Sequence, residues 1–185
     1  MEGVVGITGT PGTGKKSVAP LVAVKLGLRC YGLNDLAKTF RLLKSPDGSV
    51  DIDELRRRLR RLEGRAVVYG HLLPYAIERD AVFRVAVLRC EPSVLKRRLG
   101  KRGYSKDKVV ENVEAELIGL ESYDAFDVFG ADRTYEVDTT RSTPAESARK
   151  ILSALSGRRL LGRTVDWEHA YDTGAKLRSL LRVDP

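Results

Sequence analysis

The fold of this chain is decided by the stretch Gly9-Thr10-Pro11-Gly12-Thr13-Gly14-Lys15-Lys16-Ser17. It fits the phosphate-binding pattern G-x-x-x-x-G-K-[ST] from Gly9 to Lys15 and departs from it at Lys16, where a hydroxyl residue is expected. A hydroxyl follows one position late, at Ser17. Backbone N–H groups of such a loop surround phosphate oxygens, and its lysine reaches the β- and γ-phosphates as a point charge. The loop therefore predicts that the chain binds a nucleoside triphosphate.

The segments on either side of the loop have the pattern that the motif needs. The apolar run Val4–Thr8 is long enough for a buried strand, and residues 17–26 read as a helix that ends at Gly27. Pro20 is tolerated in that helix because it lies in the first turn. A strand, a glycine-rich loop and a helix in this order form the unit in which phosphate-binding loops occur, and the helix N-terminus adds positive partial charge.

Strands alternate with helices along the rest of the chain. Further strands are predicted at 28–33, 65–69, 81–90 and 134–138. Helices are predicted from the capping-box-like Asp51 to residue 63, from Pro92 onward, over 106–123, and from the capping box at 143–146 to residue 155. This order predicts an α/β protein with a five-stranded parallel sheet and helices on both faces.

Composition sets further bounds. The 185 residues are typical of one domain, and no apolar run approaches the ~20 residues of a membrane span. The two cysteines, Cys30 and Cys90, make no disulfide framework and are expected to be buried free thiols. No secretory signal is visible, so a cytoplasmic protein is expected. The chain has no glutamine and two asparagines, a composition typical of thermophiles.

The net charge of +8 suits phosphate ligands, and it also suits RNA or a ribonucleoprotein surface. Five arginines lie in the predicted helix 51–63, at positions 56, 57, 58, 60 and 61. They form either a solvated helix face, which we favour, or a contact surface for phosphate or RNA. The segment 157–185 is a basic tail, and its Trp167 is expected to dock on the chain's own domain.

Four segments together resemble the adenylate kinase isoenzyme 6 family and its archaeal members, which are small P-loop nucleoside monophosphate kinases. The likeness spans roughly residues 3–156, and its segments are 9–15, 34–37, 67–71 and the run from 87 through Arg102-Gly103-Tyr104 to 113. The resemblance implies a three-layer P-loop NTPase fold over residues 1–156. Within it, residues 32–55 would bind the monophosphate and residues 101–111 would form the lid.

The resemblance also implies an activity and its site. The family transfers the γ-phosphate of ATP to AMP, giving two ADP, hydrolyses ATP slowly, and assists small-subunit ribosome assembly by binding a ribosomal protein. Mg²⁺ would accompany ATP. Lys15 and Arg102 would be catalytic, with Arg102 placed by the lid over the transferring phosphoryl group. The ATP phosphates would be lined by Gly12, Thr13, Gly14, Lys15, Lys16, Ser17 and Arg102.

Two positions depart from the family around the metal. Lys16 replaces its Ser or Thr, and Tyr69 stands where members often carry an acid at the end of the third strand. Either magnesium is held mainly by ATP oxygens and waters, with Ser17 and Asp35 as outer-shell partners, or Lys16 partly substitutes for the metal and catalysis is weak or lost. His71, at the same strand end, either hydrogen-bonds an attacking group or is structural.

Three functions remain open on this reading. The leading one is an adenylate-kinase-like phosphotransferase with ATPase activity. The second is a degenerate kinase that binds a ribosomal protein or rRNA in a nucleotide-dependent way. The third is a kinase for another small acceptor, such as a nucleoside.

Overall fold

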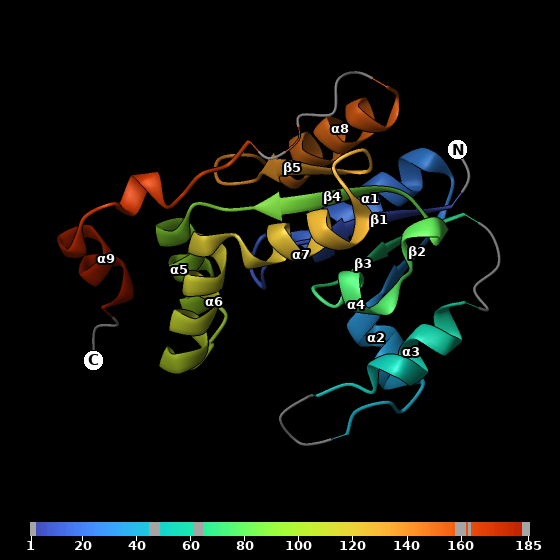
Figure 1. Cartoon of the computed structure of the whole chain (residues 1–185), viewed down its shortest axis with the longest axis horizontal. Helices are drawn as coiled ribbons and strands as arrows, with labels where there is room; N and C mark the ends of the chain where they lie inside the picture. The colour runs from blue at the N-terminus through green and yellow to red at the C-terminus, as the bar shows by residue number, and fades with distance from the viewer. Residues whose placement is uncertain (1–2, 45–48, 61–64, 158–161, 163, 183–185) are drawn as a thin grey trace.

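The computed structural model describes residues 3–44, 49–60, 65–157, 162 and 164–182 (Figure 1). Within these residues five strands form one sheet in the order β2-β3-β1-β4-β5, and every neighbouring pair is parallel. The strands are β1 Val4–Thr8, β2 Arg29–Gly32, β3 Ala66–Tyr69, β4 Val82–Arg89 and β5 Thr134–Asp138. The predicted five-stranded parallel sheet is therefore confirmed.

Helices cover both faces of this sheet and give the three layers of a P-loop fold (Figure 1). One face carries α1 Lys15–Leu26 and α8 Pro144–Leu155. The other carries α2 Leu33–Thr39, α3 Ile52–Leu59, α4 Leu73–Ala76 and α7 Leu120–Phe129. Beyond the end of β4 lie α5 Pro92–Gly100, α6 Lys106–Ile118 and α9 Gly174–Leu181. No helix in the described ranges is long and apolar enough to cross a membrane.

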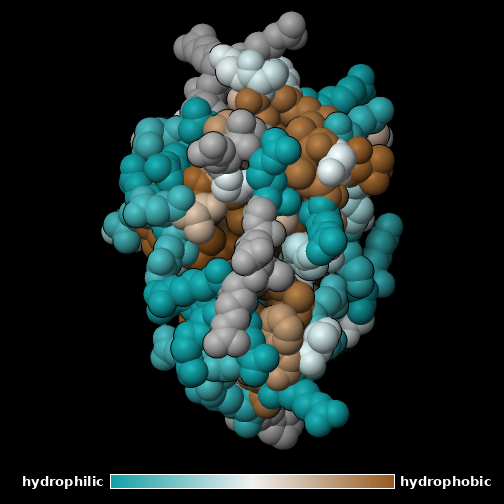
Figure 2. All heavy atoms as spheres, turned by 90° about the vertical axis from the view of Figure 1, so that its right-hand side faces the viewer, coloured by the Kyte–Doolittle hydropathy of each residue, from teal (hydrophilic) through white to brown (hydrophobic). Residues whose placement is uncertain are grey.

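The central strands are apolar because both of their faces are buried, as parallel sheets require. Val5 and Ile7 pack toward α1 and α8, whereas Val85 and Val87 pack toward the opposite helices. Gly6 lies between these β1 residues, and a Cβ there would stand 2.6 Å from Leu73 Cδ2. Only glycine at this position lets α4 approach the sheet so closely. The face drawn in Figure 2 is mostly hydrophilic, with apolar areas between the polar side chains.

Two predicted helix starts are present in the structure. Asp51 caps α3, where its carboxylate accepts the Glu54 N–H at 3.0 Å. Thr143 and Glu146 form the predicted capping box of α8. The predicted extension of the first of these helices to residue 63 falls partly on residues 61–64, which lie outside the described ranges; α3 itself ends at Leu59.

The single helix predicted over 106–123 is wrong. Gly119 adopts φ 69°, the left-handed conformation that ends a helix, and divides the segment into α6 and α7. Its N–H bonds the carbonyls of Ala115 and Glu116, which closes the last turn of α6. Helical periodicity continues through the break, so the sequence pattern did not reveal it. The break lets α6 pack against α5 while α7 lies against β4.

The described part of the tail docks on the domain, as the sequence predicted for Trp167. Its indole N–H donates to Glu116 Oε1 at 3.3 Å. The N–H groups of Thr164 and Val165 donate to Glu136 Oε2 at 2.7 and 2.8 Å. Leu180 of α9 packs into the apolar cluster between α5 and α6. The tail therefore lies against α5 and α6, and α6 contains residues 106–111 of the predicted lid.

The cysteine prediction holds only in part. Both thiols are free, but Cys90 is buried whereas Cys30 is half-buried. Cys30 lies on β2, which is an edge strand with one open side, and this position explains its exposure.

Candidate active site

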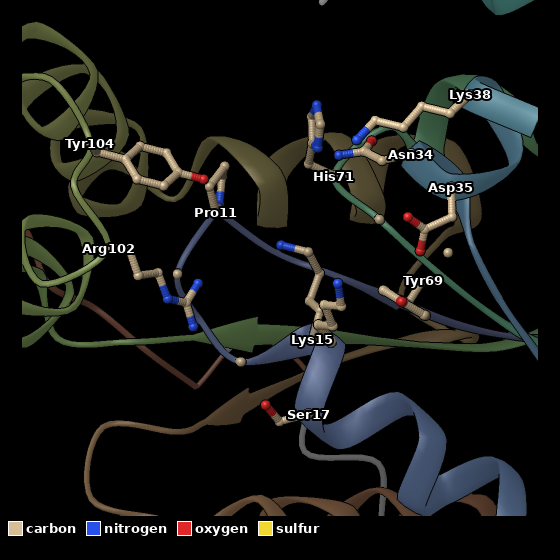
Figure 3. Close-up of a pocket in the computed structure, with 15 residues that line it drawn as sticks. Pro11, Lys15, Ser17, Asn34, Asp35, Lys38, Tyr69, His71, Arg102 and Tyr104 are labelled. Atoms are coloured by element: carbon tan, nitrogen blue, oxygen red, sulfur yellow. The ribbon is translucent and has the colours of Figure 1, made fainter. Parts of the chain in front are cut away.

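The glycine-rich loop joins the carboxyl end of β1 to α1 and borders a cavity of about 360 Å³ (Figure 3). Ligands of open parallel sheets bind at this edge, outside the carboxyl ends of the strands. The loop and the start of α1 form one wall. The other walls come from the α2 region with Gly32, Asn34, Asp35 and Lys38, the end of β3 with Tyr69, Gly70 and His71, and the turn after α5 with Arg102 and Tyr104.

The structure brings nearly all the sequence-predicted site residues to this one cavity. Its lining includes Gly12, Gly14, Lys15, Lys16, Ser17, Asp35 and Arg102. Thr13 is the exception, because its side chain is fully buried and its hydroxyl donates to the Thr10 carbonyl at 2.8 Å. The Thr13 carbonyl accepts from Thr139 Oγ1 at 2.9 Å. This residue shapes the loop from behind and does not face the cavity.

Lys15 bonds the loop itself. Its ammonium donates to the carbonyls of Gly9 and of Thr10, the latter at 3.0 Å. Burial lowers the pKa of Lys15 to about 8, although the carboxylates of Glu121 and Glu116 act in the opposite direction. A triphosphate beside this ammonium would restore its full charge, because a nearby anion favours the protonated form.

Two carboxylates from α6 and α7 lie beneath the loop. Glu116 Oε2 accepts the Thr10 hydroxyl at 2.6 Å, and Glu121 Oε2 accepts the Thr8 hydroxyl at 3.2 Å. Burial raises the pKa of Glu121 to about 7, and Lys15 opposes that rise. Sequence reasoning missed both acids, because an unbroken helix over 106–123 does not place them together. The signal that was available is Gly119 between them, a residue that commonly ends helices.

Glu116 also belongs to a buried ionic network. Arg89 Nε donates to Glu116 Oε1 at 2.8 Å, and Arg89 Nη1 donates to Glu136 Oε1 at 2.6 Å. All three side chains are at most 2% exposed. The Cys90 N–H and the Trp167 indole donate to the same Glu116 oxygen. One carboxylate thus joins β4, the tail and the phosphate-binding loop.

The opposite wall is built around the end of β3. Burial raises the pKa of the Tyr69 hydroxyl, and the charge of Asp35 and a hydrogen bond with its carboxylate raise it further. Asn34 and Lys38 line the same wall from α2. Their spacing of four residues places them on one helix face, so this pair was accessible from the sequence once α2 was assigned.

His71 is neutral at physiological pH. Burial, together with the charge of Lys15, lowers the pKa of His71 to about 4. A neutral imidazole can both donate and accept a hydrogen bond, so it can orient an acceptor oxygen without adding charge.

The lowered pKa of His71 makes the folding stability of the protein depend on pH. The folded pKa lies below the ordinary histidine pKa of 6.5, so the unfolded chain binds more protons between these two values. Stability from this group is therefore complete above pH 6.5 and is lost as the pH falls toward 4. In His71→Asn we expect a shallower decline of melting temperature between pH 7 and 4.5. The control is His169→Asn, which removes a histidine that is 94% exposed. Parallel curves for wild type and His71→Asn would contradict this assignment.

The side chains of the cavity do not form a magnesium site of their own. The motif position that normally supplies a hydroxyl to the metal carries Lys16, and Tyr69 carries no negative charge at the end of β3. Ser17 and Asp35 lie on opposite sides of Lys15 (Figure 3). No cluster of three His, Cys, Asp or Glu residues suited to a metal occurs in the described ranges. The residues present therefore do not fit a protein-held Mg²⁺ ion.

Comparison with known proteins agrees with this geometry. The AAA domain family model matches residues 5–119. A protein of Pyrococcus furiosus named "Putative adenylate kinase" is 38% identical over 174 residues, which is 91% of this chain and 93% of that protein. A protein of the same name from Methanothermobacter thermautotrophicus is 38% identical over 159 residues, covering 83% of this chain and 90% of its own length.

Solved kinase structures share the fold. A gluconokinase from Sinorhizobium meliloti has a TM-score of 0.56 at 22% identity, covering 84% of this chain and 92% of its own. A shikimate kinase from Bacteroides thetaiotaomicron has a TM-score of 0.58 at 17% identity, and the match covers 83% of this chain and 98% of the shikimate kinase chain. At these identities the likeness concerns the fold alone. From the loop, the cavity and the sequence matches together, this chain belongs to the AAA domain family and to the archaeal-type adenylate-kinase-like nucleoside monophosphate kinases.

Proposed function

We propose that this kinase transfers the γ-phosphoryl group of ATP to AMP and releases two ADP. The observation that carries the proposal is the convergence of the phosphate-binding loop, the polar face of α2 and Arg102 on one cavity. The loop side would hold ATP, and the α2 side would hold the acceptor phosphate. A phosphate oxygen of AMP forms the new bond to the γ-phosphorus as the bond from that phosphorus to the β,γ-bridging oxygen breaks.

Three of the cations that line the cavity have a place in this reaction. Lys15, at the loop, would bind the β- and γ-phosphates. Arg102 projects from the turn at 101–105 toward the loop, where a guanidinium stabilises the charge on a phosphoryl group in transfer (Figure 3). Lys38 on α2 would meet the acceptor phosphate. The turn carrying Arg102 is exposed on its outer side, so closing on a bound nucleotide would help to exclude water.

The test is ADP formation from ATP and AMP, followed in a coupled assay. In Arg102→Ala we expect kcat to fall by about 10²–10³-fold while ATP still binds, because the guanidinium acts mainly on the transition state. The matched control is Arg97→Ala, which removes an exposed arginine of α5 that does not line the cavity. Binding of ATP without any ADP formation from AMP would overturn the proposal and favour a nucleotide-dependent binding protein or a kinase for another acceptor.

Slow ATP hydrolysis belongs to the same proposal, with water taking the place of AMP. A role in small-subunit ribosome assembly in the cytoplasm rests on the family resemblance and on the net charge of +8. The described arginines of α3, together with Arg60 just after it, do not strengthen the case for a ribosomal partner. Each of these arginines forms an ion pair with an acidic side chain of this chain. The pairs are Arg56–Asp53, Arg57–Glu54, Arg58–Glu54 and Arg60–Glu78. This pairing agrees with the solvated helix face favoured from the sequence.

A further inference from the structure

We infer that this site binds its nucleoside triphosphate as the metal-free anion, with the Lys16 ammonium in the role that a divalent cation has at other phosphate-binding loops. The inference rests on the proposed function, because it concerns the same ATP site. It makes ATP affinity nearly independent of Mg²⁺, and it makes Lys16 the residue responsible for that independence.

The first observation that supports the inference is the charge of the side chains that line the cavity. Four cationic side chains line it, namely Lys15, Lys16, Lys38 and Arg102, against the single carboxylate of Asp35. Lys38 and Asp35 both belong to α2, on the acceptor side, which leaves three cations and no carboxylate of the lining for the triphosphate. A site for magnesium-bound ATP needs fewer cations, because the metal already neutralises two charges of the triphosphate. An excess of cations favours the more highly charged metal-free ligand and opposes the entry of a divalent cation.

Lys16 itself has no internal anion to balance its charge. None of the ion pairs within the described ranges involves Lys16, and its side chain is exposed at the cavity. The first turn of α1 contains no acidic residue, and its cap, Gly14, offers no side chain. The helix dipole opposes a cation at this end, so the ammonium is at its most favourable when an anion lies against the loop.

The opposite wall gives the second, independent observation. In P-loop NTPases an acid on a neighbouring strand helps to hold the metal that the loop hydroxyl ligates. Here β3 neighbours β1 and ends at Tyr69, whose hydroxyl lies near the Asp35 carboxylate, since a Cβ at Gly32 would stand 2.7 Å from Tyr69 Oη and 2.8 Å from Asp35 Oδ2. The one carboxylate of the lining thus lies near a neutral hydroxyl, and in the view of Figure 3 Lys15 stands between it and Ser17. Compared with the P-loop pattern, both positions that help to hold the metal, Lys16 in the loop and Tyr69 at the end of β3, therefore carry other residues. Lys16 also adds a positive charge.

The test measures ATP binding by calorimetry, once with Mg²⁺ and once with EDTA in place of the metal. For the wild-type chain we expect dissociation constants that agree within about threefold. For Lys16→Thr we expect the dissociation constant in EDTA to rise by about tenfold or more, because one phosphate-facing charge is lost, while the value with Mg²⁺ changes little. The matched control is Lys25→Thr, which removes an exposed cation from the last turn of the same helix.

A double variant, Lys16→Thr with Tyr69→Asp, supplies both of the expected metal-side groups. We expect its ATP affinity to depend on Mg²⁺ by more than tenfold. Circular dichroism confirms that each variant is folded before its binding is measured.

The outcomes separate this inference from the proposed function. Wild-type binding that requires Mg²⁺ would overturn the inference and leave the kinase proposal standing. An equal loss of affinity in Lys16→Thr with and without Mg²⁺ would also overturn it, since Lys16 would then be an ordinary phosphate ligand. Metal-independent ATP binding without ADP formation from AMP would support the inference and overturn the kinase proposal instead.

Discussion

Replacing Lys15 with alanine is expected to lower the rate of ADP formation by about 10²–10³-fold, the loss typical when one preorganised donor to a transition state is removed. Two effects combine in this variant. The phosphates lose the half-buried ammonium of the loop, and the Gly9 and Thr10 carbonyls lose the donor that they share in the free protein. Glu121 beneath the loop also loses the cation whose charge opposes the rise of its pKa.

The measurement is steady-state kinetics with ATP and AMP, together with the ATP dissociation constant. Lys25→Ala serves as the control, because Lys25 lies in the last turn of α1, away from the cavity. A Lys15→Ala variant with kcat within about threefold of wild type would mean that the loop does not hold the reacting phosphates.

Replacing Glu116 with alanine is expected to lower the free energy of unfolding by about 3–5 kcal/mol, the cost of breaking a buried ion pair from one side. The variant leaves Arg89, which is 2% exposed, with Glu136 as its remaining carboxylate partner. It also removes the acceptor of the Thr10 hydroxyl, the Cys90 N–H and the Trp167 indole. Buried donors without an acceptor add to the cost.

Urea unfolding followed by circular dichroism measures this effect, compared at equal m-values. The control is Glu111→Ala on the same helix, whose carboxylate is 65% exposed and paired with Lys108. Exposed pairs contribute about 0–1 kcal/mol, so this variant is expected to stay close to wild type. If Glu116→Ala loses no more than Glu111→Ala, the buried network does not stabilise the fold.

The loop and the sheet were predictable from the sequence because their signals are local. The glycine-rich motif, the apolar strand before it and the helix after it occur within 30 residues, and short-range patterns fix such units. The strands at 65–69, 81–90 and 134–138 are apolar runs bounded by turns, as buried parallel strands must be. Because these strands alternate with helices along the chain, the sheet was predicted to be parallel. Most of the predicted phosphate-facing residues reached the cavity for the same reason, since they are neighbours in the chain.

Only the tertiary structure placed the groups that support the loop. Glu116 and Glu121 lie more than 100 positions from the threonines that they bind, and they come together only because Gly119 turns α7 away from the direction of α6. The pairing of Tyr69 with Asp35 likewise joins a strand end to a helix start. No periodicity in the sequence encodes such contacts, because they depend on how separate elements pack. The sequence therefore determined most of the residues that line the cavity beside the loop, and packing decided how buried charge holds the loop in place.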